Sequence, residues 1–234
     1  MRRLDINLRE YLQQNHNQFT WKERIKIIYD IVDALDGIHD ENAIHRDLHS
    51  GNILYLQYND YWCISDFGFC GPADKTLGSI YGNLPYIAPE VIVGKESNFA
   101  SDIYSIGMLM WEISSGQPPF RDYDNYDLAI NIINGIRPKT ISGIPLEYKD
   151  LMEQCWDANP TKRPDISTLF DKIDNINKSY HQNKFNLFES SKSEANNIKA
   201  NKTNSLISNK SFTSKIYQFN DLPEPKNATE GIVI

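Results

Sequence analysis

The sequence contains few cysteines, and their spacing excludes two kinds of small protein. Its 234 residues include only Cys63, Cys70 and Cys155, with no Cys-x-x-Cys pair and no cluster of histidines beside them. Disulfide frameworks and zinc sites need more such residues at short spacing. We therefore expect neither, and we expect the chain to work in the reducing interior of the cell, in the cytoplasm.

Long apolar runs and concentrated positive charge are also missing. The most apolar stretch, residues 103–113, is shorter than a bilayer-spanning helix and includes Glu112. The 24 basic residues are scattered and outnumbered by 31 acidic ones, which gives a net charge of -7. No apolar run follows Arg2 and Arg3 as in a secretory signal. We expect no membrane span and no nucleic-acid partner.

The sequence does contain helical periodicity. Residues 20–39 repeat apolar side chains at three- and four-residue steps, and Thr20 and Glu23 have the spacing of a capping box, so an amphipathic helix is predicted there. A short helix is predicted around residues 8–12. Residues 53–65 contain two short apolar runs separated by Tyr-Asn-Asp, which predicts a β-hairpin.

The second half of the chain is also predicted to be helical. Residues 101–115 are apolar nearly all round, which indicates a helix buried on all sides, with Ser101 as its cap and Gly116 at its end. Three more helices are predicted near residues 127–134, 145–156 and 166–176. The predicted fold is therefore mainly α, with one short hairpin.

The composition changes at residue 177. Beyond it the chain is rich in Asn, Ser and Lys, with isolated hydrophobic residues that bury too little apolar surface to offset the entropy of ordering. We expect residues 1–176 to form one domain and residues 177–234 to form a disordered tail.

Three motifs carry the chemical information. They are IHRDLHSGNIL at residues 44–54, DFG at residues 66–68 and APE at residues 88–90. Each tripeptide alone is weak evidence, but their order and spacing resemble the catalytic loop, D-F-G and A-P-E of eukaryotic-type protein kinases. The stretches at residues 102–120 and 155–167 are similar to the tyrosine-kinase-like group of that family.

This resemblance implies ATP and Mg²⁺ as cofactors, a protein as substrate, and a role for each motif residue. Asp47 matches the catalytic base, and Asn52 and Asp66 match the magnesium ligands. Leu54 matches the floor under the adenine ring. Phosphoryl transfer needs a carboxylate that orients the incoming hydroxyl, and magnesium prefers oxygen ligands, so these residue types suit the chemistry. Taken alone, Asn52 and Asp66 would be ordinary turn residues.

The resemblance also implies structural roles. His45 and Phe67 match a stacked apolar column, although both could be plain core residues. Asp102 matches the residue that holds the backbone of the catalytic loop, although it could be an acid that favours the helix dipole. Glu90 and Arg163 match a buried ion pair.

Residues 66–90 have the position of an activation segment. Thr76, Ser79 and Tyr81 lie in it as candidate phosphorylation sites, and Arg46 beside the predicted base could bind a phosphate there. The three hydroxyls could equally be ordinary polar residues of a loop.

Two departures from the family pattern concern the substrate. His49 stands where serine/threonine kinases usually have a lysine, and a neutral imidazole neutralises the γ-phosphate less well. Asn83 stands where they usually have a threonine. Residues 84–86 still resemble their substrate platform more than that of tyrosine kinases, so we favour serine/threonine specificity.

A third departure concerns ATP. Kinase domains open with a glycine-rich loop, a lysine on a strand and a glutamate on a helix. The residues before His45 contain no Gly-x-Gly, and Lys22 and Lys26 fall in the predicted amphipathic helix. We therefore expect a C-terminal lobe over residues 1–176, with the N-lobe β-sheet absent.

Three hypotheses remain open. The chain is an active kinase recorded without its N-terminal lobe, or an inactive lone lobe that acts as a pseudokinase or scaffold module. A small-molecule kinase of the same fold class is the third, but such enzymes usually lack D-F-G together with A-P-E.

Overall fold

The fold is mainly α, as predicted. The computed structural model describes residues 6–72, 80–121, 123, 125–187, 213–219 and 222–227. The helices in these residues are α1 (Leu8–Asn15), α2 (Trp21–Asp40), α3 (Pro89–Ile92), α4 (Phe99–Ser115), α5 (Asn125–Ile133), α6 (Leu146–Cys155) and α7 (Ile166–Leu187). No helix in the described part of the chain is long and apolar enough to cross a lipid bilayer.

The predicted hairpin is also confirmed. Strands β3 (Ile53–Leu56) and β4 (Tyr61–Ile64) pair antiparallel, with Ile53 opposite Ile64, and β1 (Ile6–Asn7) adds to the other side of β3. Two smaller pairs join distant segments, and both lie next to the catalytic-loop motif. They are β2 (Ala43–Ile44) with β5 (Gly71–Pro72), and β6 (Ile80–Gly82) with β7 (Lys215–Tyr217).

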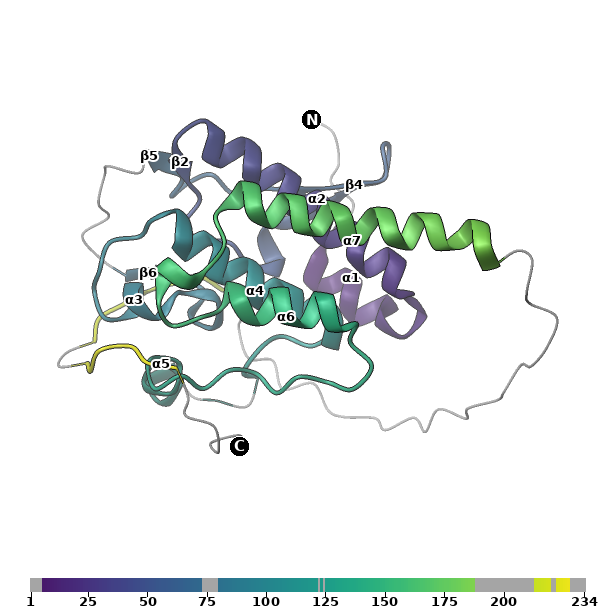
Figure 1. Cartoon of the computed structure of the whole chain (residues 1–234). Helices are drawn as coiled ribbons and strands as arrows, with labels where there is room; N and C mark the ends of the chain where they lie inside the picture. Colours follow the sequence, from purple (N-terminus) through teal and green to yellow (C-terminus); the bar gives the residue numbers. More distant parts are fainter. Residues whose placement is uncertain are drawn as a thin grey trace.

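Helix α2 forms where the capping box and the apolar repeat predict it. The backbone N–H of Glu23 donates to Thr20 Oγ1, and the Glu23 carboxylate accepts from the Thr20 N–H at 2.7 Å, so two N-terminal N–H groups are satisfied. Ile28 and Leu35 on the apolar face are fully buried. Figure 1 shows α7 lying along α2, and together with α4 these helices enclose the core.

Helix α4 is buried as predicted, but its cap differs from the prediction. Asn98, not Ser101, is the N-cap, because Phe99 and Ala100 are already helical. Ser101 occupies the third helical position, where its hydroxyl accepts from the Asn98 N–H at 2.9 Å. The helix ends at Gly116, whose φ of 72° is the left-handed conformation that glycine adopts without steric cost.

The C-terminal part departs from the expected boundary at residue 177. Helix α7 continues to Leu187, because Ile173 and Ile176 are followed on the same face by the half-buried Tyr180. Residues 213–219 and 222–227 pack on the helical domain, where isolated hydrophobic residues such as Leu222 contact the core. The composition of an isolated chain does not reveal such docking. The rest of the expected tail lies outside the described residues.

The second docked segment is held at its C-terminal end by two neighbouring residues. The N–H of Lys226 donates to the carbonyl of Ile133 at the end of α5. The Asn227 side chain accepts from the Ala158 N–H at 2.8 Å and donates to Asp157 at 3.0 Å. In Figure 1 the yellow trace of this region runs beside β6 and α5.

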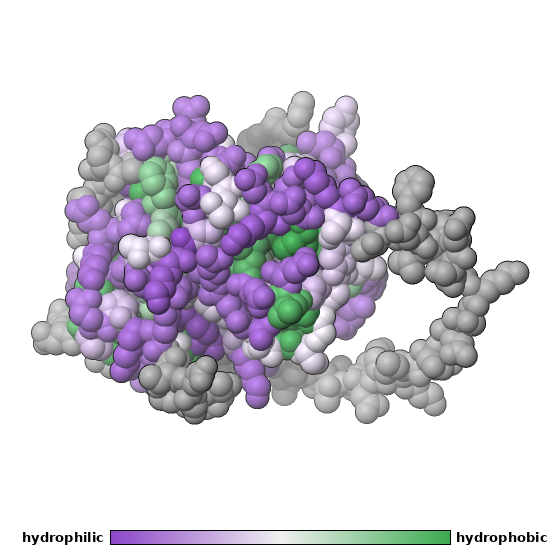
Figure 2. Space-filling model, viewed as in Figure 1, coloured by the Kyte–Doolittle hydropathy of each residue, from purple (hydrophilic) through white to green (hydrophobic). Residues whose placement is uncertain are grey.

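The described surface over α6 and α7 is mainly hydrophilic. Figure 2 shows hydrophobic atoms only in small areas there, one of them between α7 and the start of α6. Leu146, at that start, is 69% exposed. Single exposed apolar side chains of this kind are normal for a folded domain.

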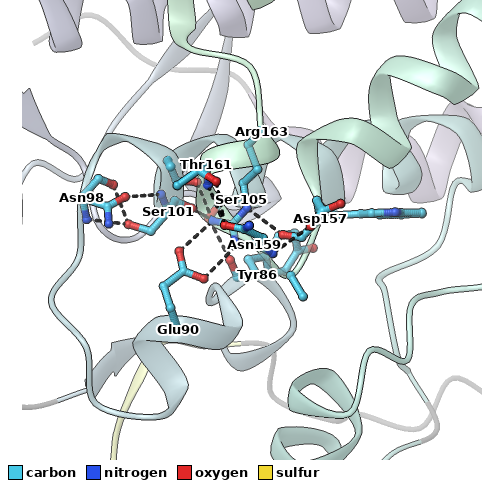
Figure 3. A network of polar contacts seen from close by, with 12 residues as sticks. Tyr86, Glu90, Asn98, Ser101, Ser105, Asp157, Asn159, Thr161 and Arg163 are labelled. Carbon is cyan, nitrogen blue, oxygen red and sulfur yellow. Dashed lines mark hydrogen bonds and ion pairs between the residues drawn. The ribbon is translucent and has the colours of Figure 1, made fainter. Parts of the chain in front are cut away.

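The predicted ion pair between Glu90 and Arg163 is confirmed. The two guanidinium nitrogens donate to the two carboxylate oxygens, each at 2.7 Å, and both side chains are buried. Arg163 also donates to the carbonyls of Ala100 and Asp157, each at 2.8 Å. Figure 3 shows Glu90 and Asp157 around Arg163. One arginine thus joins the A-P-E segment to α4 and to the turn before α7.

We expect Glu90→Ala to lower the free energy of unfolding by about 3–5 kcal/mol, because it leaves the Arg163 charge buried without its acid. Urea unfolding measures this change. Glu153→Ala removes an acid from the half-exposed pair with Lys149 and should cost at most about 1 kcal/mol. Equal losses in the two variants would contradict the assigned difference between a buried and a surface pair.

Candidate active site

The catalytic-loop motif runs from the end of β2 through the short 3-10 helix Ser50–Asn52 into β3. Its backbone is held by a buried acid. Arg46 has a φ of 72°, a left-handed conformation that is costly for a residue with a side chain. Asp102 in the first turn of α4 accepts the backbone N–H groups of His45 at 2.8 Å and Arg46 at 3.0 Å. His39 lies 3.1 Å from the same carboxylate. These bonds agree with the role that the resemblance implies for Asp102.

Asp47 follows directly and faces the interior of the site. Its side chain is buried, and burial raises the pKa of the carboxyl, with the nearby charge of Asp66 adding to the rise. Hydrogen bonds from Ser214 and from the Asn83 backbone oppose the rise. The Asn52 side-chain amide donates to the Asp47 carbonyl at 2.9 Å and lies 3.5 Å from its carboxylate. Asp47 and Asn52 are therefore held as one unit.

Ser65 joins this unit to the D-F-G motif. Its N–H and its hydroxyl both donate to the carbonyl of Asn52, at 2.8 and 2.9 Å. Its own carbonyl lies 3.0 Å from Nε2 of His45. Asp66, the next residue, is exposed and has a φ of 60°. The chain thus brings the three residues predicted to carry the chemistry to one place from two separate segments.

The oxygen atoms available there suit a magnesium ion that also binds phosphates. Among the described residues no hydrogen bond uses Oδ1 of Asn52, and the Asp66 carboxylate accepts only a long bond, 3.4 Å, from the Gly68 N–H. In the same part of the chain, no three His, Cys, Asp or Glu side chains form a closed metal cluster. Magnesium typically takes one or two protein oxygens and completes its shell with phosphate and water. The donor set therefore fits Mg²⁺ with ATP.

The remaining residues predicted around the nucleotide lie at the mouth of the site. The rings of His45 and Phe67 meet edge to face with 5.7 Å between centroids, and Phe67 is 54% exposed. Leu54 is half-buried in the middle strand of the small sheet, opposite Asn7 and Cys63. The adenine contact of Leu54 stays a prediction.

His49 is held in one tautomer. The Gly51 N–H donates to its Nδ1 at 3.0 Å, so Nε2 carries the proton. Burial, with help from the positive charge of Arg9, lowers the pKa of His49 to about 3. The imidazole is therefore neutral near pH 7. A Cβ on Gly51 would lie 2.8 Å from the ring, so this close approach requires glycine.

A buried polar network behind the loop was not predicted. The carboxylate of Glu112, on α4, accepts from the Ser50 hydroxyl at 2.9 Å and from the Tyr86 hydroxyl. Arg9 on α1 donates to Ser50 at 3.1 Å. Burial raises the pKa of Glu112, which Arg9 and the two hydroxyls oppose. The signal in the sequence was a single charged residue within the apolar stretch 103–113.

The activation segment is only partly described. Arg46 donates to the carbonyls of Phe69 at 3.0 Å and Pro72 at 2.8 Å, so it fixes the start of this segment. Tyr81 stacks on Phe69 with 3.6 Å between ring centroids. Thr76 and Ser79 lie outside the described residues. Phosphorylation of this segment stays a prediction.

Residues far along the chain complete the site. Strand β7 pairs antiparallel with β6, which belongs to the activation segment, and this places Ser214 against the catalytic loop. The Ser214 hydroxyl donates to Asp47 Oδ1 at 2.7 Å, and Nε2 of His49 lies 3.1 Å from Ser214 Oγ. The sequence prediction missed Ser214, because its residue type is common in the Asn, Ser and Lys-rich region.

Comparison with known proteins agrees with this site. The profile of the family described as protein tyrosine and serine/threonine kinase matches residues 5–173. The chain belongs to this protein kinase family. The match covers the catalytic loop, the D-F-G and the A-P-E of the kinase domain, and the region up to α7. The family is one of phosphotransferases.

Curated relatives include kinases with wide specificity. The kinase domain is 32% identical over 200 residues to "Dual specificity protein kinase zakA" of Dictyostelium discoideum, covering 77% of this chain and 26% of that protein. It is 31% identical over 176 residues to "Dual serine/threonine and tyrosine protein kinase" of Apis mellifera, and the alignment covers 70% of this chain and 18% of that protein. The aligned region spans between 10% and 29% of the length of the most similar curated relatives.

We expect Asp102→Ala to lower the free energy of unfolding by at least about 2 kcal/mol, because two N–H groups of the catalytic loop lose their acceptor. Chemical unfolding tests this. Asp127→Ala is the control, because it removes an exposed acid from the first turn of α5. It should lower the free energy of unfolding only by the interaction with the helix dipole, about 0.3–1 kcal/mol. If both substitutions cost the same, Asp102 acts only as a first-turn acid.

His49 should make the domain less stable in acid. Its folded pKa of about 3 lies below the ordinary 6.5, so the unfolded chain binds the proton first and stability falls as the pH drops below 6.5. Between pH 7 and pH 5 we expect wild type to lose about 2 kcal/mol more than His49→Gln. Urea unfolding at both pH values measures this difference. His181→Gln, at an exposed position, serves as control, and an equal loss in wild type and His49→Gln would refute the assignment.

Proposed function

We propose that this site transfers the γ-phosphate of ATP to a hydroxyl group of a protein substrate. The observation that supports this most strongly is the joint placement of Asp47, Asn52 and Asp66. The first two are linked by hydrogen bonds, and Ser65 connects Asn52 to the residue before Asp66. In this proposal Asp47 is the catalytic base, and Asn52 and Asp66 hold Mg²⁺.

Each residue of the site has its own role in the proposed reaction. Bound Mg·ATP supplies the phosphoryl group and neutralises the charge that develops on it. Asp47 orients the acceptor hydroxyl and takes its proton, and its raised pKa makes it a better proton acceptor. Asn52 keeps Asp47 in place through its amide N–H while Oδ1 remains for the metal. Asp102 fixes the loop that carries both residues.

The proposal includes a preference for serine and threonine over tyrosine. An aliphatic hydroxyl reaches Asp47 Oδ1 at 2.7 Å while its backbone continues into a strand against β6. A tyrosine hydroxyl stands much farther from its backbone, so the same backbone path would not suit it. The printed names of several relatives include both specificities, and we propose the narrower one for this chain.

One observation favours a second candidate, a kinase lobe without activity that serves as a scaffold. The described residues before the catalytic loop are mainly helical, and the sequence there has no Gly-x-Gly. Lys26 is engaged by Asp30 and by the carbonyl of Asp60, each at 2.7 Å, so it is not placed to clamp a phosphate. This candidate predicts a folded chain with binding partners and no phosphate transfer.

Radiolabelled ATP with Mg²⁺ and the full 234-residue chain separates the two candidates. We expect phosphate incorporation into a serine-containing peptide, at least about 100-fold slower in Asp47→Asn, because general base catalysis contributes 10²–10⁴-fold. EDTA should abolish incorporation. Asp150→Asn, at an exposed position of α6, should leave the rate unchanged. Absence of any transfer by the wild-type chain would favour the scaffold. A cytoplasmic location stays part of this proposal.

A further inference from the structure

Residues 213–219 form an extended segment beside the predicted base. Strand β7 pairs with β6 of the activation segment in a separate two-stranded sheet. The paired residues are Ile80 with Tyr217, Tyr81 with Ile216, and Gly82 with Lys215. Addition of an extended segment to an exposed strand is a common mode of peptide recognition, in which the backbone gives affinity and alternate side chains give specificity.

Side chains of this segment alternate as recognition in a strand requires. Tyr217 and Phe219 pack against the hydrophobic core, with their rings 5.7 Å apart and nearly parallel. Gln218, between them, is exposed, and so is Ile216, before Tyr217, at 66%. The register is therefore fixed by partly buried aromatic residues as well as by backbone pairing.

This register places one hydroxyl at the predicted base. The Ser214 O–H donates to Asp47 Oδ1 at 2.7 Å, and the protonated Nε2 of His49 donates to Ser214 Oγ at 3.1 Å. The directions of these two hydrogen bonds are compatible, because the Gly51 N–H fixes the tautomer in which His49 Nε2 carries the proton. A serine hydroxyl has two lone pairs, so one remains for attack after the bond from His49.

We propose that Ser214 is a phosphoacceptor for the catalytic site of its own chain. This inference rests on the proposed kinase function. In the step, Ser214 Oγ forms a bond to the γ-phosphorus of ATP, and the bond from that phosphorus to the β,γ-bridging oxygen breaks. The electron pair leaves with ADP, and the hydroxyl proton goes to the Asp47 carboxylate.

The product has a consequence for access to the site. A phosphate on Ser214 carries about two negative charges and would lie beside the carboxylate of Asp47 and near that of Asp66. Like charges in a partly buried place repel, so β7 leaves β6 after transfer. The unmodified segment excludes other substrates, and its phosphorylation opens the groove to them.

Hydrogen exchange without ATP tests the docking itself. Ser214→Asp places a carboxylate beside Asp47, and we expect the amides of β6 to exchange at least tenfold faster than in the wild-type chain. Gln218→Asp adds the same charge at an exposed position of the same segment and should leave the exchange of β6 unchanged. Equal exchange of β6 in wild type and Ser214→Asp would overturn the proposal.

Mass spectrometry of the full chain after incubation with Mg·ATP tests the transfer. We expect phosphate on Ser214, formed at a first-order rate that does not depend on the concentration of the chain. Ser214→Ala should remove this phosphate, Ser214→Thr should retain a phosphate at the same position, and Ser179→Ala on α7 should not change it. A rate that rises in proportion to concentration would show transfer between two copies and overturn the proposal.

A peptide with the sequence of residues 211–219 separates the failure of this inference from that of the proposed function. If the chain phosphorylates the peptide but not its own Ser214, the inference is wrong and the kinase function stands. If neither is phosphorylated, the proposed function fails for this chain and the acceptor role fails with it, whatever the exchange experiment shows about docking.

Discussion

The buried carboxylate of Asp102 is the constraint on which the site depends. The catalytic loop turns through a left-handed residue, Arg46, and such a conformation persists only where surrounding bonds determine it. Asp102 supplies two of those bonds from the first turn of a helix that is buried over residues 101–114. Because the loop turns there, Asp47 faces inward and Arg46 reaches the start of the activation segment. The placement of the proposed base and of the start of the activation segment thus depends on one acid.

Helix α4 supplies a second acid for the same loop. Glu112 lies about three turns after Asp102 and holds Ser50 and Tyr86, which belong to the catalytic loop and to the substrate platform. An unpaired buried charge is costly, so each acid is surrounded by donors. The most apolar helix of the domain therefore fixes the polar geometry of the active site.

The sequence was sufficient wherever local rules or an ordered motif decide the structure. The capping box at Thr20 and Glu23 predicts α2, and the motif spacing predicts that Asp47, Asn52 and Asp66 belong together. Ser101 failed as a cap because Asn98, three residues earlier, competes for the same role. The sequence pattern contains nothing that pairs β7 with β6, because that contact joins segments more than 130 residues apart and depends on a surface formed only after folding. From composition alone, residues 213–227 were predicted to belong to a disordered tail.

The anchor at Asn227 affects how fast residues 213–219 return to β6 after they dissociate. This residue and Lys226 bind Ala158 and Ile133 independently of β7, so residues 213–219 remain tethered when they leave the site. A tethered segment returns with an effective concentration in the millimolar range for a short flexible link. A separate protein that binds at β6 must compete with this effective concentration. It therefore needs a high affinity, or it must bind while β7 is displaced. In the proposed phosphoacceptor role, selectivity among substrates depends on the residence time of a segment of the chain itself, in addition to the contacts that each substrate makes.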